Sequence, residues 1–478
     1  MNLLVIFALV VGGVGGWTLI MRNWRMAIYL LFCFTPVTGL VVAAMQPSPL
    51  GNLARDIMII IPLYIAYMLT KRPTDRAFVP FSVLAAAFAL SVVVILQVAI
   101  RSADNPALGV LGAKIWLMYI PLIIVGGAFL SSQKDLRYAL RTIVITSWLP
   151  FVVGIMMWAG AIAYDYRESV ELLYGEFARN ATQGFVQLKV GETTFYRIPS
   201  TFQFVSQYSA FCQFMIFPIL MLIRVDTGRR WRIFGYVTLV LAIVAALTCG
   251  SRGVFLYLPV MFIILAGLRI GAKGKPSLAI ALVLLVVSAI AALYFDQSAI
   301  YDNIADLTEH YGQGLVVGGL EYAVENGGFW GLGPGTAAIA SRYVIDPSLT
   351  NTLFSNAVEN YYAKSWTELG AIGFVADVSL LVSIAVTGLL TVSRIRDPKL
   401  KDCGIAALAM ALYLMFISTR GLPLDQDPFA YYYYLFVGFM FKLPYLAGQP
   451  VTKPVQNRRW AGPLRRPIQN PGVRTHRP

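Results

Sequence analysis

The sequence predicts an all-α, polytopic transmembrane helical bundle. Its composition indicates a membrane protein, because 58% of the 478 residues are hydrophobic and only 13% are charged. Apolar stretches also recur at about 17 to 25 residues, the length at which a helix crosses a ~30 Å hydrocarbon core. We expect about thirteen spans, at approximately 3 to 20, 26 to 45, 57 to 70, 77 to 100, 109 to 130, 142 to 163, 202 to 223, 233 to 249, 254 to 268, 277 to 294, 371 to 392, 403 to 419 and 428 to 447.

Basic residues in the short loops predict how these spans are oriented. One side of the membrane, counted with the C-terminal tail and Lys442, carries 27 basic and five acidic residues. Because loops rich in Lys and Arg stay in the cytoplasm, we expect this side to be cytoplasmic, with the N-terminus outside and the C-terminus inside. Two long loops, about 164 to 201 and 295 to 370, then lie on the outer face and are expected to form a partly helical cap.

The chain divides into a transmembrane domain, 1 to 447, and a basic, proline-rich tail, 448 to 478. The tail has seven Lys and Arg residues and no acidic residue, so it cannot bury a core and is expected to be disordered in the cytoplasm. It suits attachment to anionic lipid headgroups or docking of a cytoplasmic partner. The net charge of +14 is thus explained by topology, and we expect no nucleic-acid partner.

Three arginines on the outer side are not explained by the rule that keeps basic residues inside. They are Arg197, where the first long loop returns to the membrane, Arg252, in the short turn Ser251-Arg252-Gly253, and Arg342, in the second long loop. A guanidinium group is permanently charged and can donate two parallel hydrogen bonds to phosphate oxygens. These arginines are therefore candidates for binding a diphosphate. The alternatives are an interfacial anchor for Arg197 and Arg252 and a solvated loop residue for Arg342.

The second long loop carries three motifs in order. They are Gly331-Leu332-Gly333-Pro334-Gly335, Glu359-Asn360-Tyr361-Tyr362 and Glu368-Leu369-Gly370-Ala371-Ile372-Gly373. This order resembles the O-antigen ligase and O-antigen polymerase superfamily, in which Gly-Leu-Gly-x-Gly precedes an Asn-aromatic segment and Glu-Leu-Gly-x-x-Gly. The Ser-Arg-Gly turn and the segment that begins at Arg197 are similar to further family features, so the resemblance covers roughly residues 195 to 375.

The resemblance implies a metal-independent, inverting glycosyltransferase of the bacterial inner membrane that needs no cofactor. Its donor is an undecaprenyl-diphosphate-linked glycan and its acceptor is another glycan, with chain-length regulator or flippase proteins as candidate partners beside the lipid bilayer. Carried over to this sequence, Arg197 and Arg252 bind the diphosphate that leaves when the anomeric carbon is attacked, and Arg342 is a third candidate.

The acceptor side of the predicted site differs from the family pattern. Ligases of the superfamily carry a histidine immediately before the Asn of the loop motif, and here that position is Glu359. A carboxylate can act as general base, so Glu359 is a catalytic candidate, the alternative being a solvated loop carboxylate. The remaining candidates for substrate binding are Asn360, Tyr361, Gly333, Gly335 and His310. The glycine amides can cradle phosphate oxygens or simply permit tight turns.

The missing histidine favours a polymerase of O-antigen or exopolysaccharide repeat units. The close alternative is an O-antigen ligase that transfers the glycan to a lipid A core or a protein. A flippase or transporter is the alternative from another class, although no repeated halves are visible. Asp425-Gln426-Asp427 resembles the Asp-x-Asp of metal-dependent transferases, but we expect no bound metal. Lys114 and Asp377 lie inside predicted spans, where ions are costly, so we expect both to have partners.

Overall fold

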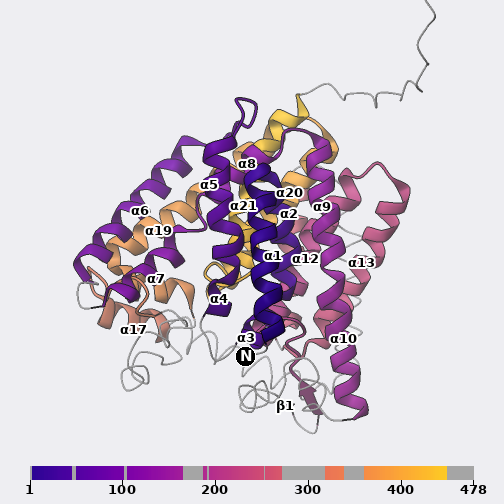
Figure 1. Ribbon diagram of the computed structural model, residues 1–478, viewed down its shortest axis with the longest axis horizontal. Coiled ribbons are helices and arrows are strands. Elements are labelled where there is room, and N and C mark those ends of the chain that lie inside the picture. Colours follow the sequence, from indigo (N-terminus) through magenta and orange to yellow (C-terminus); the bar gives the residue numbers. More distant parts are fainter. Residues whose placement is uncertain are drawn as a thin grey trace, which may run out of the picture. The chain divides into compact units, whose positions relative to one another are not determined.

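The computed structural model describes residues 3–45, 50–101, 105–164, 187–190, 193–251, 253–271, 318–337 and 360–448. Within these ranges the chain is helical, as predicted, apart from connections and one antiparallel hairpin in which β1 (Gln187–Val190) pairs with β2 (Thr193–Tyr196) (Figure 1). The N-terminal helices are α1 (Leu3–Arg22), α2 (Arg25–Phe34), η1 (Thr35–Val37), α3 (Thr38–Met45), α4 (Leu50–Arg55), η2 (Asp56–Ile60), α5 (Ile61–Thr70), α6 (Phe81–Arg101), α7 (Pro106–Leu117), α8 (Leu122–Phe129), α9 (Gln133–Thr146) and α10 (Trp148–Ala163). The remaining helices are α12 (Val205–Val225), α13 (Arg229–Thr248), α14 (Gly253–Gly271), α17 (Gly318–Gly327), α19 (Tyr361–Ser393), α20 (Pro398–Ile417) and α21 (Phe429–Ala447).

Nine helical segments of the described residues are long and apolar enough to cross a membrane, as the sequence predicts for a multi-pass protein. The expected total of thirteen stays a prediction. The spans expected at 3 to 20, 254 to 268 and 428 to 447 are helical but are not among these nine, and the span at 277 to 294 lies outside the described residues. The nine segments are Arg25–Ala43, Leu53–Thr70, Phe81–Arg101, Pro106–Phe129, Gln133–Ala163, Val205–Val225, Arg229–Thr248, Tyr361–Ser393 and Pro398–Ile417.

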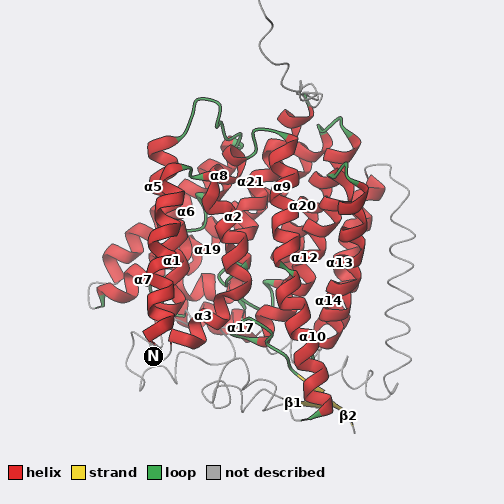
Figure 2. Ribbon diagram, turned by 45° about the vertical axis from the view of Figure 1, so that its right-hand side comes forward, coloured by secondary structure: helices red, strands yellow, loops and turns green. Residues whose placement is uncertain are grey.

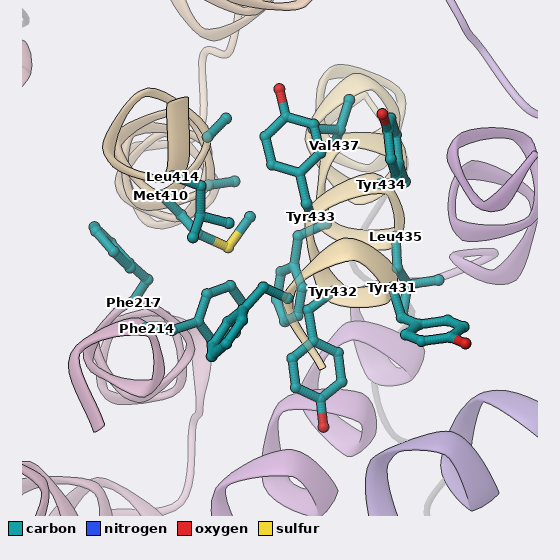
Figure 3. Packing of buried hydrophobic residues seen from close by; sticks show 14 of the residues in the cluster. Phe214, Phe217, Met410, Leu414, Tyr431, Tyr432, Tyr433, Tyr434, Leu435 and Val437 are labelled. Atoms are coloured by element: carbon teal, nitrogen blue, oxygen red, sulfur yellow. The ribbon is translucent and has the colours of Figure 1, made fainter. Parts of the chain in front are cut away.

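The core of the bundle is built around α21, which packs against α8, α20 and α19. Four consecutive tyrosines on this helix are buried, so α21 meets protein on every side. Figure 3 shows Phe214 of α12 directed toward Tyr432, and the two rings stack with centroids 5.4 Å apart. By contrast, α6 exposes Phe81, Phe88 and other large apolar side chains, which suit contact with lipid rather than water. The four tyrosines are Tyr431, Tyr432, Tyr433 and Tyr434.

Five basic loops meet at one end of the bundle, which we name the basic end. Ion pairs join each of these loops to another, as expected if all five lie on the same side of the membrane. Which compartment this end faces stays a prediction. The pairs are Arg25 with Asp75 (2.7 Å), Arg25 with Asp135 (3.9 Å), Arg141 with Asp226 (2.6 Å) and Arg224 with Asp402 (3.4 Å).

The opposite end holds the hairpin, α17 and residues 418–428, which connect α20 to α21; we name it the loop end (Figure 2). Lys114 and Asp377, the two charged residues that the sequence predicts inside spans, both have partners at this end. The Lys114 Nζ atom lies 2.8 Å from Asp56 Oδ2. The Tyr361 hydroxyl donates a hydrogen bond of 3.0 Å to Asp377 Oδ1. The prediction that both ions are partnered is therefore confirmed.

Candidate functional site

The described residues include only part of the predicted site. Arg197, Asn360, Tyr361, Gly333 and Gly335 are described, and all five lie at the loop end. The other four candidates lie outside the described residues, and so does most of the predicted cap formed by the two long loops. The four are Arg252, Arg342, Glu359 and His310.

The segment that begins at Arg197 is buried between several helices. The Ile198 amide donates a hydrogen bond of 3.0 Å to the carbonyl of Cys249, directly after α13. The Ser200 hydroxyl donates a hydrogen bond of 2.6 Å to the carbonyl of Pro150 in α10. The Ile198 amide and the Ser200 hydroxyl thus both have partners within the protein. These two hydrogen bonds hold the backbone that follows Arg197 beside the turn between α13 and α14.

Gly250 allows this turn to approach the Arg197 segment closely. Its φ of +71° is in the left-handed region that favours glycine. A Cβ atom at this position would overlap the carbonyl oxygen of Tyr196 and would lie 3.0 Å from Arg197 Cα. The close approach therefore depends on the absence of a side chain at Gly250. It places Arg197 next to the turn in which Arg252 follows Ser251.

Arg420 of the loop between α20 and α21 reaches the same turn. Its Cζ atom lies 4.2 Å from the centroid of the Tyr257 ring, so the guanidinium group stacks on an aromatic face. A Cβ atom added to Gly253 would lie 2.8 Å from the same Cζ atom. The Arg420 guanidinium thus packs against the residue that follows Arg252. The sequence did not place Arg420 among the candidates for diphosphate binding, although the predicted orientation of the spans puts this arginine on the outer side.

The start of α19 connects the Asn-aromatic motif to the Arg420 loop. The Asn360 side chain caps the helix by accepting hydrogen bonds from the amides of Tyr362 (2.9 Å) and Ala363 (3.3 Å). The Tyr361 amide donates to the carbonyls of Ser418 (3.0 Å) and Gly421 (3.1 Å), on either side of Arg420. Asn360 and Tyr361 are both buried. They therefore have structural roles here, and their contact with substrate stays a prediction.

The glycine-rich segment folds around Glu368. The Gly335 amide donates to Glu368 Oε2 (3.0 Å), and the Ala337 amide donates to Oε1 (2.9 Å). The Gly333 amide donates to the Glu368 backbone carbonyl (3.0 Å). Both glycines have positive φ angles, of +115° and +92°. Since these amides already have acceptors within the protein, the geometry supports the tight-turn alternative over the phosphate cradle for Gly333 and Gly335.

Buried ion pairs surround these segments. The Lys364 Nζ atom forms an ion pair with Asp425 and lies 3.9 Å from Glu368 Oε1. A second group contains Arg55, which pairs with Asp427. Burial raises the pKa of the Asp427 carboxyl above its ordinary value, although the nearby positive charges of Arg55 and Lys114 oppose that rise. Both carboxylates of the Asp425-Gln426-Asp427 segment therefore face cations of the protein itself.

These ion pairs could not be predicted from the sequence, because Lys364 and Asp425 are 61 residues apart and have no motif in common. Within the part of the chain that the structure describes, no three His, Cys, Asp or Glu side chains form a group suited to a metal ion. Comparison with models of known protein families and with curated proteins finds no match to this chain. The fold and site thus define a multi-pass helical membrane protein in which the Arg197 segment, the turn after α13 and the Arg420 loop meet at the loop end.

Proposed function

We propose that this protein is a polymerase that joins undecaprenyl-diphosphate-linked oligosaccharide repeat units into O-antigen or exopolysaccharide at the outer face of the inner membrane. The observation that carries the proposal is the meeting of Arg197, the 250–253 turn and Arg420 at the end of the bundle opposite the basic loops. The Arg420 guanidinium lies there, and Arg197 and Arg252 belong to the two segments beside it. Three guanidinium groups directed to one place would match a ligand with a diphosphate group at membrane level. In this proposal the basic end faces the cytoplasm and the loop end faces outward.

The reaction forms one bond and breaks one bond at the anomeric carbon of the donor. An acceptor hydroxyl oxygen attacks this carbon while the bond between the carbon and the phosphate oxygen breaks. The configuration at the anomeric carbon therefore inverts. The hydroxyl proton passes to Glu359, and undecaprenyl diphosphate leaves with the bonding electrons. Arg197, Arg252 and Arg420 neutralise the charge that develops on the leaving group, with Arg342 as a further candidate. No metal ion or cofactor is required for this step.

The test uses purified protein in lipid nanodiscs with lipid-linked repeat units as the only substrate, and the glycan length is read on gels. We expect a ladder of products from the wild type. The Arg252→Ala and Glu359→Gln variants should leave single repeat units, with rates lower by about 10²-fold or more, because each removes a group that acts in the transition state. The control is Arg230→Ala, which removes an exposed arginine at the basic end.

The same assay distinguishes the alternatives. Growth of the chain with lipid-linked units alone supports the polymerase. Transfer that occurs only after a lipid A core or a protein is added would identify a ligase instead. Passage of the lipid-linked substrate across a liposome membrane without a change in glycan length would identify a flippase. Unchanged ladders from both the Arg252→Ala and the Glu359→Gln variants would refute the site assignment.

A further inference from the structure

The loop between α20 and α21, residues 418–428, is held by ions from two other parts of the chain. Lys364 of α19 pairs with Asp425, and Arg55 at the end of α4 pairs with Asp427. The Lys364 and Arg55 side chains are completely buried. A buried ion carries a large desolvation cost, which is offset only when its partner is well placed. These pairs therefore define the position of the loop closely.

Lys364 also contacts the glycine-rich segment, through Glu368. The Glu368 carboxylate accepts hydrogen bonds from the Gly335 and Ala337 amides and from the Trp116 indole (2.7 Å), and it lies 3.9 Å from the Lys364 ammonium group. The ammonium group is in addition 5.4 Å from the Trp116 ring centroid. Lys364 is thus the cation that lies between the glycine-rich segment and the loop that carries Arg420.

We propose that Lys364 is a positioning residue, which fixes the 418–428 loop through Asp425 and so places the Arg420 guanidinium against the turn that contains Arg252. Arg420 and Asp425 are in the same short loop, and the Tyr361 amide binds that loop only at Ser418 and Gly421 among the described contacts. The Lys364–Asp425 pair restrains the part of the loop that follows, together with the Arg55–Asp427 pair nearer its end. The consequence for donor binding rests on the proposed function, whereas the restraint on the loop does not.

The test removes the Lys364–Asp425 pair, and the buried charge that remains, the Glu368 carboxylate, keeps its hydrogen-bond donors. Lys364→Met combined with Asp425→Asn deletes both charges, while Glu368 keeps its three hydrogen-bond donors, so the variant is expected to fold. Hydrogen exchange measured by mass spectrometry should show exchange of the 418–428 amides faster by about tenfold or more. The apparent KM for the lipid-linked donor should rise by roughly 10- to 100-fold, the range expected for a displaced charged hydrogen-bond donor.

A combined variant separates positioning from a general loss of stability. If Lys364 acts through Arg420, adding Arg420→Ala to the Lys364→Met/Asp425→Asn protein will lower activity no further than Arg420→Ala does alone. If removal of the ion pair instead acts through a general loss of stability, its loss of activity and that of Arg420→Ala will multiply. That result would overturn the proposal. The matched control is Arg224→Met with Asp402→Asn, an ion pair at the basic end, which should change neither loop exchange nor KM.

Failure of this proposal is distinguishable from failure of the proposed function. Unchanged exchange of residues 418–428 in the paired variant overturns the role of Lys364, whatever the enzyme does. Faster exchange together with full polymerisation by Arg420→Ala supports the restraint on the loop and overturns its link to donor binding. Full polymerisation by Arg252→Ala and Glu359→Gln refutes the assigned catalytic site, and the exchange measurement still decides the role of Lys364.

Discussion

The two ends of the bundle use ion pairs in different ways. At the basic end, Arg224 and Asp402 are each about one-third exposed, so water and salt screen their attraction. At the loop end, Lys364 and Glu368 have no exposed side-chain surface. Exposed pairs contribute roughly 0 to 1 kcal/mol, whereas breaking a buried pair costs about 3 to 5 kcal/mol. The Arg224–Asp402 pair can thus vary as long as its charges remain, whereas Lys364 makes contacts that depend on its position.

The largest expected effect comes from breaking one loop-end pair on one side only. Lys364→Met leaves the Asp425 and Glu368 carboxylates buried without their shared cation. We expect the free energy of unfolding to fall by about 3 to 5 kcal/mol, measured by reversible unfolding in detergent. Arg224→Met is the matched control and should cost no more than about 1 kcal/mol. Equal losses in the two variants would show that the ends do not differ as proposed.

A smaller effect is expected from the backbone contact between the turn and Arg197. Gly250→Ala places a methyl group against the Tyr196 carbonyl at a φ of +71°, so the turn must move away from the Arg197 segment. We expect a loss of about 1 to 3 kcal/mol in stability and a drop in polymerase activity larger than that loss explains. The control is Gly267→Ala, because a Cβ atom there has no neighbour within 4 Å. Wild-type activity in Gly250→Ala would refute the need for the close approach.

Much of the helical architecture could be predicted from sequence, because a bilayer requires spanning segments to be long, apolar and hydrogen-bonded internally. The grouping of the basic loops was also predictable, since charge alone decides which side retains them. The breaks inside spans were not predicted. The segments Thr35–Val37 and Asp56–Ile60 leave regular α-helix at Pro36 and at the charged residue Asp56, but neither residue by itself predicts which helix type replaces the α-helix. The hairpin of β1 and β2 was likewise missed, because its short strands carry little pattern.

The candidate site was predictable only where a motif marks it. The glycines and Asn360 stand out in sequence, yet the structure gives them turns and a helix cap, which are local roles. Their long-range partners could not be predicted, since the contact of Arg420 with the turn after α13 depends on how α14 and α20 pack. Burial of Lys364 beside Asp425 likewise arises only from tertiary packing. Residues that are far apart in the chain have no characteristic spacing, so a sequence pattern cannot identify the contacts between them.

The smallest expected effect concerns Asp226, the best-paired carboxylate of the basic end. Arg141 donates to both of its oxygens, at 2.6 and 2.9 Å, and the Gly228 amide donates at 2.7 Å. Burial acts to raise the pKa of Asp226, but these hydrogen bonds to the ionised form lower it below its ordinary value of 3.8. Since the folded-state pKa is the lower one, the stabilisation is present at neutral pH and is lost as the pH falls through that value.

The Asp226→Asn variant tests this sign and the ranking of the two ends together. At neutral pH it should lower the free energy of unfolding by about 1 kcal/mol, less than Lys364→Met does, because the Arg141 side chain remains partly in water. The difference between the variant and the wild type should shrink as the pH falls below about 4, since protonation then removes the same charge from the wild type. Unfolding measured at several pH values checks both points. A difference that grows toward acid pH would mean that the fold stabilises the protonated, neutral Asp226 side chain through burial rather than the ionised side chain through Arg141.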